Sequence, residues 1–322
     1  MTESRSLRRV DVSVVVVNYN TAHLLKEMRD ALDASSASLS VEIIIVDNAS
    51  RDESVVVLKR DFADAKLIFN DTNVGFGRAN NQGLAIATGR HILLLNTDAF
   101  VAPDTLSKTI AYMDEHSDCG VLGVRLVGRD GVLQPCCRYF PTPWNLFLNR
   151  TGLHKFFPGT RMVDDMDWDH ASVRECDWIV GCYFLIRREV TDRVGLFDPR
   201  YFLYSEEVDL CRMTKSAGWK VVFYPHTTVI HIGGESAKSD SPLTSGGQIS
   251  SLQIESELLY FRKHHGLLGA AAAVFLSTLT DAIVVVKNTL QARWQRVAGA
   301  RQHLAMYWAS VMQTRLGSRA TR

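Results

Sequence analysis

Three short, almost purely apolar segments near the start of this 322-residue chain constrain its fold more than any other feature. They are residues 12–17 (VSVVVV), 41–46 (VEIIIV) and 91–95 (HILLL). Strands that are buried on both faces are continuous apolar runs of this kind, without alternating polar residues. Between the first two runs, Leu24, Met28 and Leu32 recur at four-residue spacing, which indicates one face of a helix. Ser50 and Glu53 have capping-box spacing and predict a second helix start. This alternation predicts an α/β fold with a mostly parallel sheet and helices on both faces.

Polar clusters follow each of these predicted strands, at residues 18–20, 47–50 and 96–98. In such sheets, ligands bind outside the carboxyl ends of the strands. Asp98 could therefore hold Mg²⁺ or Mn²⁺ together with substrate phosphate oxygens, or it could simply end a strand in a turn. Asp47 could accept hydrogen bonds from a ribose or a base, or it could belong to a helix cap.

Three further segments carry chemistry-bearing residues. Gly75 and Gly77 lie at a predicted loop-to-helix junction, where glycine permits a close backbone approach to a ligand. Residues 206–209 (EEVD) hold three carboxylates, which form either a general base with a raised pKa or a solvated helix start. His231 ends an apolar run and could be a metal ligand, although a lone histidine is more often structural.

Composition excludes some classes of protein. A net charge of +1 gives no overall field for nucleic acid, so we expect no nucleic-acid partner. The six cysteines form no C-x-x-C pair, which argues against a zinc site. The N-terminus has no signal-peptide pattern, so we expect reduced thiols and a cytoplasmic location.

Taken together, seven segments occur in the order found in family 2 glycosyltransferases, and the chain resembles that family over about residues 11–236. The segments are VSVVVVNYN, VDNAS, NVGFGRANNQG, LLNTDAFV, GCYFLIRR, FDPRYFLYSEEVDLCRM and VIHIGGES. Within the family, the chain most resembles bacterial rhamnosyltransferases of cell-wall and polysaccharide assembly. The resemblance implies the GT-A fold, a Rossmann-like nucleotide-binding sheet. We predict a catalytic domain at 1–236, then a loop and a helical, membrane-associating region at 237–322.

The resemblance also implies a role for individual residues. Asp98 corresponds to the last aspartate of the D-x-D metal motif, and His231 to the histidine that completes a Mn²⁺ or Mg²⁺ site. Asn96 stands where the family often has the first aspartate, a departure that removes one carboxylate. Glu206 and Glu207 correspond to the Glu-Asp pair, of which the second member is the catalytic base. The nucleotide-sugar contacts implied are Asn18, Asn20, Asp47, Asn73, Gly75, Asn80 and Asn96, and the acceptor region implied is Trp178, Gly181 and Asp209.

The predicted reaction is an inverting, metal-dependent sugar transfer to a glycan or to a polyprenyl-diphosphate-linked sugar. The expected donor is dTDP-L-rhamnose, with UDP-sugars as the alternative, and the loop at 233–248 is expected to close over it. Two other classes stay open: a nucleotidyltransferase, which would carry a Gly-rich basic loop after the first strand, and an inactive glycan-binding module. The sequence leaves open whether the chain forms a homo-oligomer.

The C-terminal tail is apolar first and basic afterwards. Residues 267–286 are about long enough to span a bilayer, but Asp281 lies among them. From 282 to 322 there are seven lysines and arginines and no acidic residue. An apolar stripe with two tryptophans follows, which is typical of a helix lying on an anionic membrane. The stripe consists of Leu290, Trp294, Val297, Leu304, Trp308 and Val311. We therefore predict a peripheral protein on the inner face of the plasma membrane, with packing of the stripe on protein as the alternative.

Overall fold

The computed structural model describes residues 10–164, 168–233 and 251–322. The strands are β1 (Val12–Asn18), β2 (Val41–Asp47), β3 (Lys66–Phe69), β4 (His91–Leu95), β5 (Ala99–Val101), β6 (Cys119–Val127), β7 (Leu133–Gln134), β8 (Cys137–Arg138), β9 (Arg174–Cys176), β10 (Trp178–Ile179), β11 (Tyr183–Arg187) and β12 (Lys220–His231). The helices are α1 (Ala22–Ser35), α2 (Ser54–Asp61), α3 (Phe76–Ile86), α4 (Thr105–Glu115), α5 (Pro143–Thr151), the short 3-10 helix η1 (Leu153–Phe156), α6 (Arg188–Val194), α7 (Glu206–Ser216), α9 (Ser251–Leu290) and α10 (Trp294–Gln313).

One sheet runs through the catalytic half of the molecule in the order β3-β2-β1-β4-β11-β6-β12-β5. The first four strands of this order are parallel to one another, which confirms the predicted α/β sheet. Strand β11 is antiparallel to both β4 and β6, so the second half of the sheet is mixed. Because β1, β2 and β4 are parallel, their carboxyl ends and the polar clusters that follow them share one edge of the sheet.

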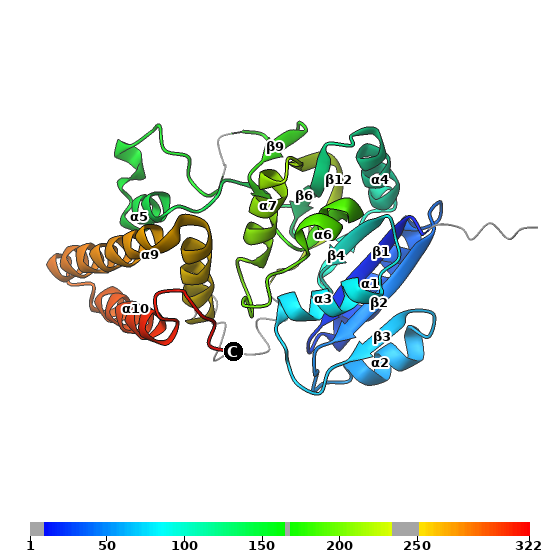
Figure 1. Ribbon diagram of the computed structural model, residues 1–322, viewed down its shortest axis with the longest axis horizontal. Helices are drawn as coiled ribbons and strands as arrows, with labels where there is room; N and C mark the ends of the chain where they lie inside the picture. The colour runs from blue at the N-terminus through cyan, green and yellow to red at the C-terminus, as the bar shows by residue number, and fades with distance from the viewer. Residues whose placement is uncertain (1–9, 165–167, 234–250) are drawn as a thin grey trace, which may run out of the picture.

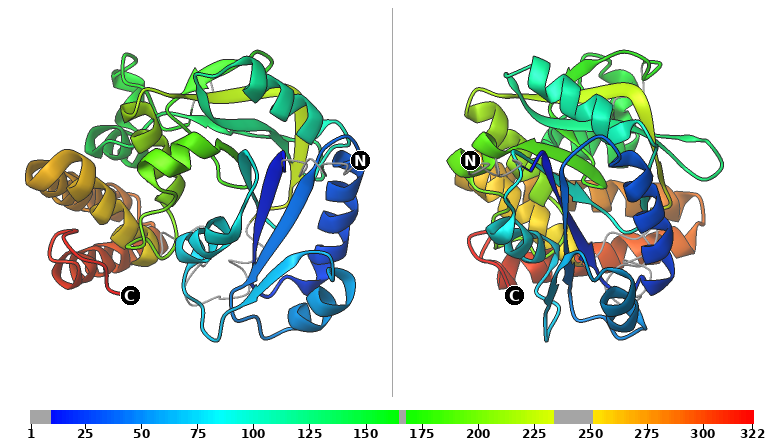
Figure 2. Two further views of the ribbon diagram at one scale, coloured as in Figure 1. Left: turned by 45° about the vertical axis from the view of Figure 1, so that its right-hand side comes forward. Right: turned by 90° about the vertical axis from the view of Figure 1, so that its right-hand side faces the viewer.

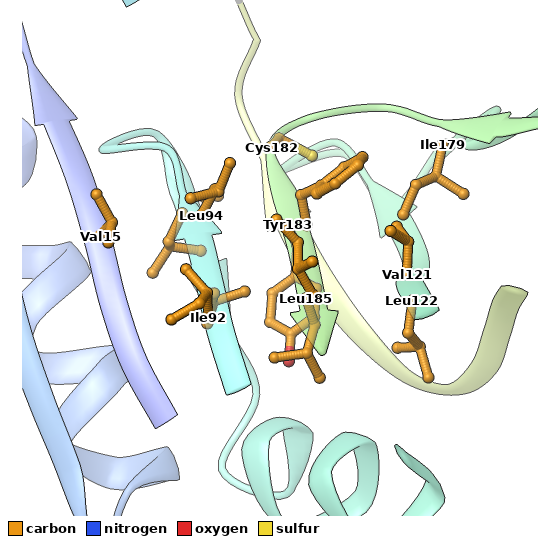
Figure 3. Close-up of a cluster of buried hydrophobic side chains, with 14 of the residues drawn as sticks. Val15, Ile92, Leu94, Val121, Leu122, Ile179, Cys182, Tyr183 and Leu185 are labelled. Carbon is orange, nitrogen blue, oxygen red and sulfur yellow. The ribbon is translucent and has the colours of Figure 1, made fainter. Parts of the chain in front are cut away.

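The core lies where the parallel and mixed halves of the sheet meet. Figure 3 shows Val15 of β1, Ile92 and Leu94 of β4 and Leu185 of β11 as neighbours in this cluster, and all four are buried. Complete burial of a Val, Leu or Ile side chain contributes about 1.5–3 kcal/mol, so these central strands are firmly anchored. They carry the site residues at their ends on a rigid base.

The two helices predicted from short-range patterns differ in outcome. Helix α1 buries Leu24, Met28 and Leu32 on one face, as the spacing predicts. The capping-box prediction is wrong, because α2 begins at Ser54 with Glu53 as its N-cap residue and without a side-chain cap. Ser50 instead bonds to residues at the end of β1 (see below), so its side chain is committed elsewhere.

Helices α9 and α10 lie side by side at one end of the molecule, away from β2 and β3 (Figures 1 and 2). Helix α9 is bent at Gly266, whose φ of 67° and ψ of −163° are not helical. The part before Gly266 packs on the catalytic half, and α9 also packs against α5. The predicted domain boundary near residue 237 lies outside the described residues, as does the predicted lid at 233–248 except for Gly233.

The prediction that the apolar stripe forms a single outward face is wrong. Val297 and Val311 are buried, the latter in a small core with Tyr307 and residues of α9. Trp294 and Trp308 are exposed. The alternative interpretation therefore holds for the two valines of the stripe, which α10 buries.

Candidate active site

The ends of β1 and β2 form a hydrogen-bonded cluster around two predicted nucleotide contacts. The Asn18 amide donates to Asp47 Oδ2 at 2.7 Å and to Ser50 Oγ at 3.0 Å. The Ser50 N–H donates to Asp47 Oδ1 at 3.0 Å, and Ser50 Oγ also accepts from the Asn20 N–H at 2.9 Å. Asn20 has a φ of 54°, a conformation that asparagine tolerates better than most residues. The cluster holds Asp47, which is buried, in one orientation.

A cavity of about 530 Å³ opens beside this cluster, and Asp47, Ser50 and Asn73 are among the residues that line it. Its size lies within the range of about 300–1,000 Å³ that is common for small-molecule sites. The cavity is also lined by Tyr19 and Phe69, two aromatic residues that the sequence did not single out. An aromatic wall next to a carboxylate suits a nucleoside, because bases stack on aromatic rings and their N–H groups donate hydrogen bonds.

The segment after β3 is held by contacts within the chain. A side chain at Gly75 would meet the backbone oxygen of Phe202 at 2.6 Å, and the Phe76 N–H donates to that oxygen at 2.8 Å. The glycine therefore admits another part of the chain, and its contact with the nucleotide-sugar stays a prediction. Asn73 Oδ1 accepts from the Gly75 N–H and from the Asn48 amide. Asn80 is buried on α3 and donates to the Phe76 carbonyl, so its amide serves its own helix.

Asp98 and His231 are brought together, as predicted for a metal site. His231 Nε2 lies 3.6 Å from Asp98 Oδ1, and Asp98 Oδ2 accepts from the Gly233 N–H at 3.1 Å. His231 Nδ1 lies 2.8 Å from Gln134 Oε1, and the Gln134 amide donates to the His231 carbonyl. Gln134 Oε1 can only accept a hydrogen bond, so the Nδ1–H of His231 donates to it. Nε2 then carries the lone pair, on the side of the ring that faces Asp98. Burial also lowers the pKa of His231, which favours the neutral form that metals bind.

Asp98 supplies the carboxylate oxygen that a hard divalent cation prefers, whereas the imidazole of His231 is a softer ligand. No group of three or more His, Cys, Asp or Glu side chains gathers at metal-binding distance among the described residues. Mg²⁺ sites commonly use one or two protein ligands and take their remaining oxygens from a bound phosphate and water. Asn96 contributes its backbone to this region, where its N–H donates to the Cys182 carbonyl at 3.0 Å.

Glu206 and Glu207 open helix α7, directly after two residues in the left-handed region. Tyr204 has a φ of 74° and Ser205 a φ of 66°. Such conformations are strained for residues other than glycine and cluster at functional sites. Glu206 is buried, and its Oε2 has no hydrogen-bond partner in the described parts of the chain. Burial and the charge of Glu207 raise the pKa of Glu206 well above its ordinary value. Burial also raises the pKa of Glu207, while Arg138 lowers it.

The side chain of Glu207 lies beside Gly181. A side chain at Gly181 would meet Glu207 Cβ at 3.9 Å and Cδ at 4.0 Å, so the carboxyl group of Glu207 lies against this glycine. The next residue, Cys182, accepts the backbone bond of Asn96 described above. Trp178 lies close by but is buried, and its indole N–H donates to the Tyr139 carbonyl at 2.8 Å.

Asp209 is not available to an acceptor. Its side chain is completely buried, and it accepts from Lys263 Nζ at 2.7 Å while its other oxygen contacts His264. Both partners belong to α9, and Lys263 also pairs with Asp198 at 3.0 Å. Asp209 therefore joins α7 to α9, and we leave it out of the acceptor site.

Comparison with known proteins shows the family to which the chain belongs. Residues 13–195 match the family described as glycosyl transferase family 2. An N-acetylglucosaminyl-diphospho-decaprenol L-rhamnosyltransferase of Mycobacterium tuberculosis is 26% identical over 244 residues, which cover 70% of this chain and 78% of that protein.

Solved structures show the same fold at low sequence identity. The mannosyltransferase PcManGT from Pyrobaculum calidifontis, in complex with GDP-Man and Mn²⁺, matches with a TM-score of 0.54 and 17% identity, covering 97% of this chain and 88% of that one. S. aureus TarS 1–349 matches with a TM-score of 0.51 and 15% identity, covering 95% and 92%. The predicted GT-A fold is confirmed. With the family match spanning more than half of its length, this chain belongs to glycosyl transferase family 2 and is a glycosyltransferase that takes its sugar from a nucleotide-sugar.

Proposed function

We propose that the enzyme transfers L-rhamnose from dTDP-L-rhamnose, with inversion, to a glycan or a polyprenyl-diphosphate-linked sugar in cell-wall or polysaccharide assembly. The choice of sugar and acceptor rests on the mycobacterial relative, whose name specifies L-rhamnosyl transfer and N-acetylglucosaminyl-diphospho-decaprenol. UDP-sugars are the alternative donors, since TarS was also crystallised with UDP. The observation that carries the reaction class is that Glu207 lies against Gly181, while the next residue, Cys182, accepts from the N–H of Asn96, two residues before Asp98.

The donor nucleotide is proposed to occupy the cavity beside Asp47. Ser50 and Asn18 each occupy one lone pair of the carboxylate, and a carboxylate has about four lone-pair sites, so Asp47 can still accept a bond from a ribose hydroxyl or a base N–H. Phe69 and Tyr19 would contact the base or the ribose. These contacts position the donor and take no part in bond breaking.

Asp98 and His231 are proposed to hold Mn²⁺ or Mg²⁺ together with the donor diphosphate. A bound divalent cation neutralises the charge that develops on a leaving diphosphate. The contribution of the protein is to keep both side chains in place: Gln134 fixes the imidazole, and the Gly233 N–H fixes the carboxylate.

Glu207 is proposed as the general base. It removes the proton of the acceptor hydroxyl as that oxygen attacks the anomeric carbon, and the bond to the diphosphate breaks on the opposite face. Glu206 is the more deeply buried of the two glutamates, so we propose that Glu206 is the one that stays protonated. A neutral Glu206 leaves Glu207 as the carboxylate that can accept a proton at neutral pH.

We also propose a location for the enzyme, on the cytoplasmic face of the plasma membrane. A lipid-linked acceptor is presented there, and the C-terminal region from about residue 237 carries the basic charge that an anionic surface attracts. The catalytic domain of residues 1–236 would then work beside the lipid headgroups.

The test is a screen of donors with the full-length enzyme. Nucleoside diphosphates and their sugars are added with Mn²⁺ or with a chelator, and the melting temperature and diphosphate release are both recorded. A ligand that binds only the folded state raises the melting temperature by mass action. We expect the largest shift with dTDP or dTDP-L-rhamnose, and only with metal. Release from a UDP-sugar alone would change the donor, and no metal-dependent binding or release from any donor would contradict the proposed activity.

A further inference from the structure

The second half of α9 has the reverse of the polarity that a water-soluble helix shows. Between 267 and 286, every exposed residue is apolar: Leu267, Leu268, Ala271, Ala272, Phe275, Leu279, Ala282 and Val286. We call this set the apolar strip. The buried side of the same stretch holds Ser277, Thr280 and Asp281 beside alanine and valine. A helix at a water-exposed surface normally buries its apolar side and exposes its polar side.

Two of these buried polar groups, Ser277 and Asp281, bond to neighbouring helices. Asp281 accepts from Arg150 of α5 at 2.7 Å and pairs with His303 of α10 at 2.7 Å. Arg150 also donates to Ser277 Oγ at 3.0 Å. These bonds tie α5, α9 and α10 into one unit and fix which side of α9 points outward.

The same bonds argue against α9 crossing a membrane by itself. It is the one helix among the described residues that is long and apolar enough to cross. If α9 crossed a membrane by itself, Asp281 would lose its partners Arg150 and His303 and would face lipid. An unpaired aspartate is strongly disfavoured in the hydrocarbon core of a bilayer. The strip, by contrast, can enter the outer part of a bilayer while the inner side keeps its partners.

The charged residues near the apolar strip indicate what kind of surface the strip contacts. Seven lysines and arginines and no acidic residue follow Asp281, and Lys287, Arg293 and Arg296 lie at the end of the strip, all exposed. Trp294 is exposed among them, and tryptophan favours the boundary between water and lipid. An apolar face with a basic rim and an interfacial aromatic residue matches an anionic bilayer rather than another protein surface.

We propose that the apolar strip of α9 inserts into the acyl layer of an anionic membrane, parallel to its plane, and that the arginines after it contact the lipid phosphates. The inference deepens the proposed function, because it holds the enzyme where a lipid-linked acceptor lies. It also moves the membrane contact from the tryptophan stripe of α10, whose valines are buried, to the outer side of α9. Insertion rather than charge then supplies most of the binding.

The experiment is flotation of the full-length protein with vesicles of phosphatidylglycerol and phosphatidylcholine, at low and high salt. Phe275 is 67% exposed, so Phe275→Asp should leave the fold intact, which its melting temperature checks. Val56→Asp on α2 is the matched control, since Val56 is 64% exposed on a different helix. We expect at least a tenfold loss of binding for Phe275→Asp at both salt concentrations and no loss for Val56→Asp. Arg293→Gln with Arg296→Gln should weaken binding only to the anionic vesicles at low salt.

Three results would overturn the proposal: flotation of Phe275→Asp equal to that of the wild type, failure of the wild-type protein to float, or a wild-type dimer that Phe275→Asp makes monomeric. The last would show that a second copy covers the strip. Nucleoside diphosphate release from the donor in solution, without vesicles, is measured on the same samples. It should be equal in Phe275→Asp and the wild type, so a failure of the proposed catalytic activity is detected separately.

Discussion

The two halves of the active site differ in how their polar groups are satisfied. On the donor side, Asn18, Asp47 and Ser50 hydrogen-bond to one another, and the buried carboxylate accepts two bonds. On the base side, Glu206 is buried with an oxygen that has no partner in the described residues, and the pKa of Glu207 is raised. A network in which the polar groups are hydrogen-bonded keeps its geometry and suits ligand binding. A carboxylate that lacks hydrogen-bond donors binds its proton more tightly, which suits proton transfer.

Backbone conformation follows the same division. The strained residues Tyr204 and Ser205 precede the base, and the Phe202 carbonyl before them is held by the N–H of Phe76. The loop after β3 thus supports the base side, although its sequence motif pointed to the donor. Residues in this backbone conformation next to Glu206 motivate the proposal that this segment is functional.

The largest effect is expected on the base side. Glu207→Gln removes the proton acceptor and should lower single-turnover rates by about 10²–10⁴-fold. Donor affinity, measured by calorimetry with Mn²⁺, should stay within about twofold, because the donor side is untouched. Glu206→Gln is the matched control: a neutral Glu206 resembles glutamine, so its rate should fall far less. Wild-type turnover in Glu207→Gln would remove Glu207 from the mechanism.

The next effect concerns the metal. Gln134→Ala frees the His231 ring, and loss of such a supporting partner commonly costs about 10–100-fold in metal affinity. The half-saturating Mn²⁺ concentration for donor release should rise accordingly, while the rate at saturating Mn²⁺ recovers. Gln313→Ala, at an exposed position on α10, serves as the control. An unchanged Mn²⁺ requirement would argue that His231 is not a ligand.

A smaller effect is expected in the donor-side network. Ser50→Ala removes the acceptor for the Asn18 amide and the Asn20 N–H, at a cost of about 1–2 kcal/mol in unfolding free energy. The melting temperature should fall by a few °C, and nucleotide affinity should fall with it. Ser318→Ala, exposed near the C-terminus, should change neither. Equal melting curves for both variants would show that the network is not a stabilising one.

The smallest effect on turnover is expected for Glu257, whose burial should affect stability but not catalysis. Burial raises the pKa of Glu257 on α9 to about 7, although Arg150 lowers it. The folded state therefore favours the protonated acid: its contribution is complete below the ordinary pKa of 4.5 and is lost as the pH rises towards about 7. Glu257→Gln should melt like the wild type at pH 5 and a few °C higher at pH 8, with unchanged turnover. A loss of turnover would mean that a buried carboxyl outside the site also serves the reaction.

Most of the sheet could be predicted because its central strands are continuous apolar runs in the sequence. The run at residues 91–95 is β4 in full, and the polar residues after it lie at the strand end as expected. Asp98 and His231 could be paired from the family resemblance, and they lie together. The predicted catalytic roles themselves remain predictions.

What could not be predicted depends on contacts between distant segments. Gln134 is 97 residues from His231 and carries no motif of its own. The apolar residues of α10 could not be divided between lipid and protein without knowing where α9 lies. Asp281 counted against a membrane-spanning helix in the sequence, and in the fold it is paired with Arg150, which leaves the outer side of α9 apolar. Gly75 signalled a close approach correctly, but the approaching group is Phe202.

The most direct test of the account is a crystal structure with nucleoside diphosphate and Mn²⁺, with the metal located by anomalous scattering. We predict one Mn²⁺ peak bound by Asp98 and His231 Nε2 and by the diphosphate, with the base in the cavity beside Asp47 and Glu207 facing the sugar position. A peak elsewhere, or a nucleotide bound away from Asp47, would contradict the proposed assembly of donor, metal and base at one centre.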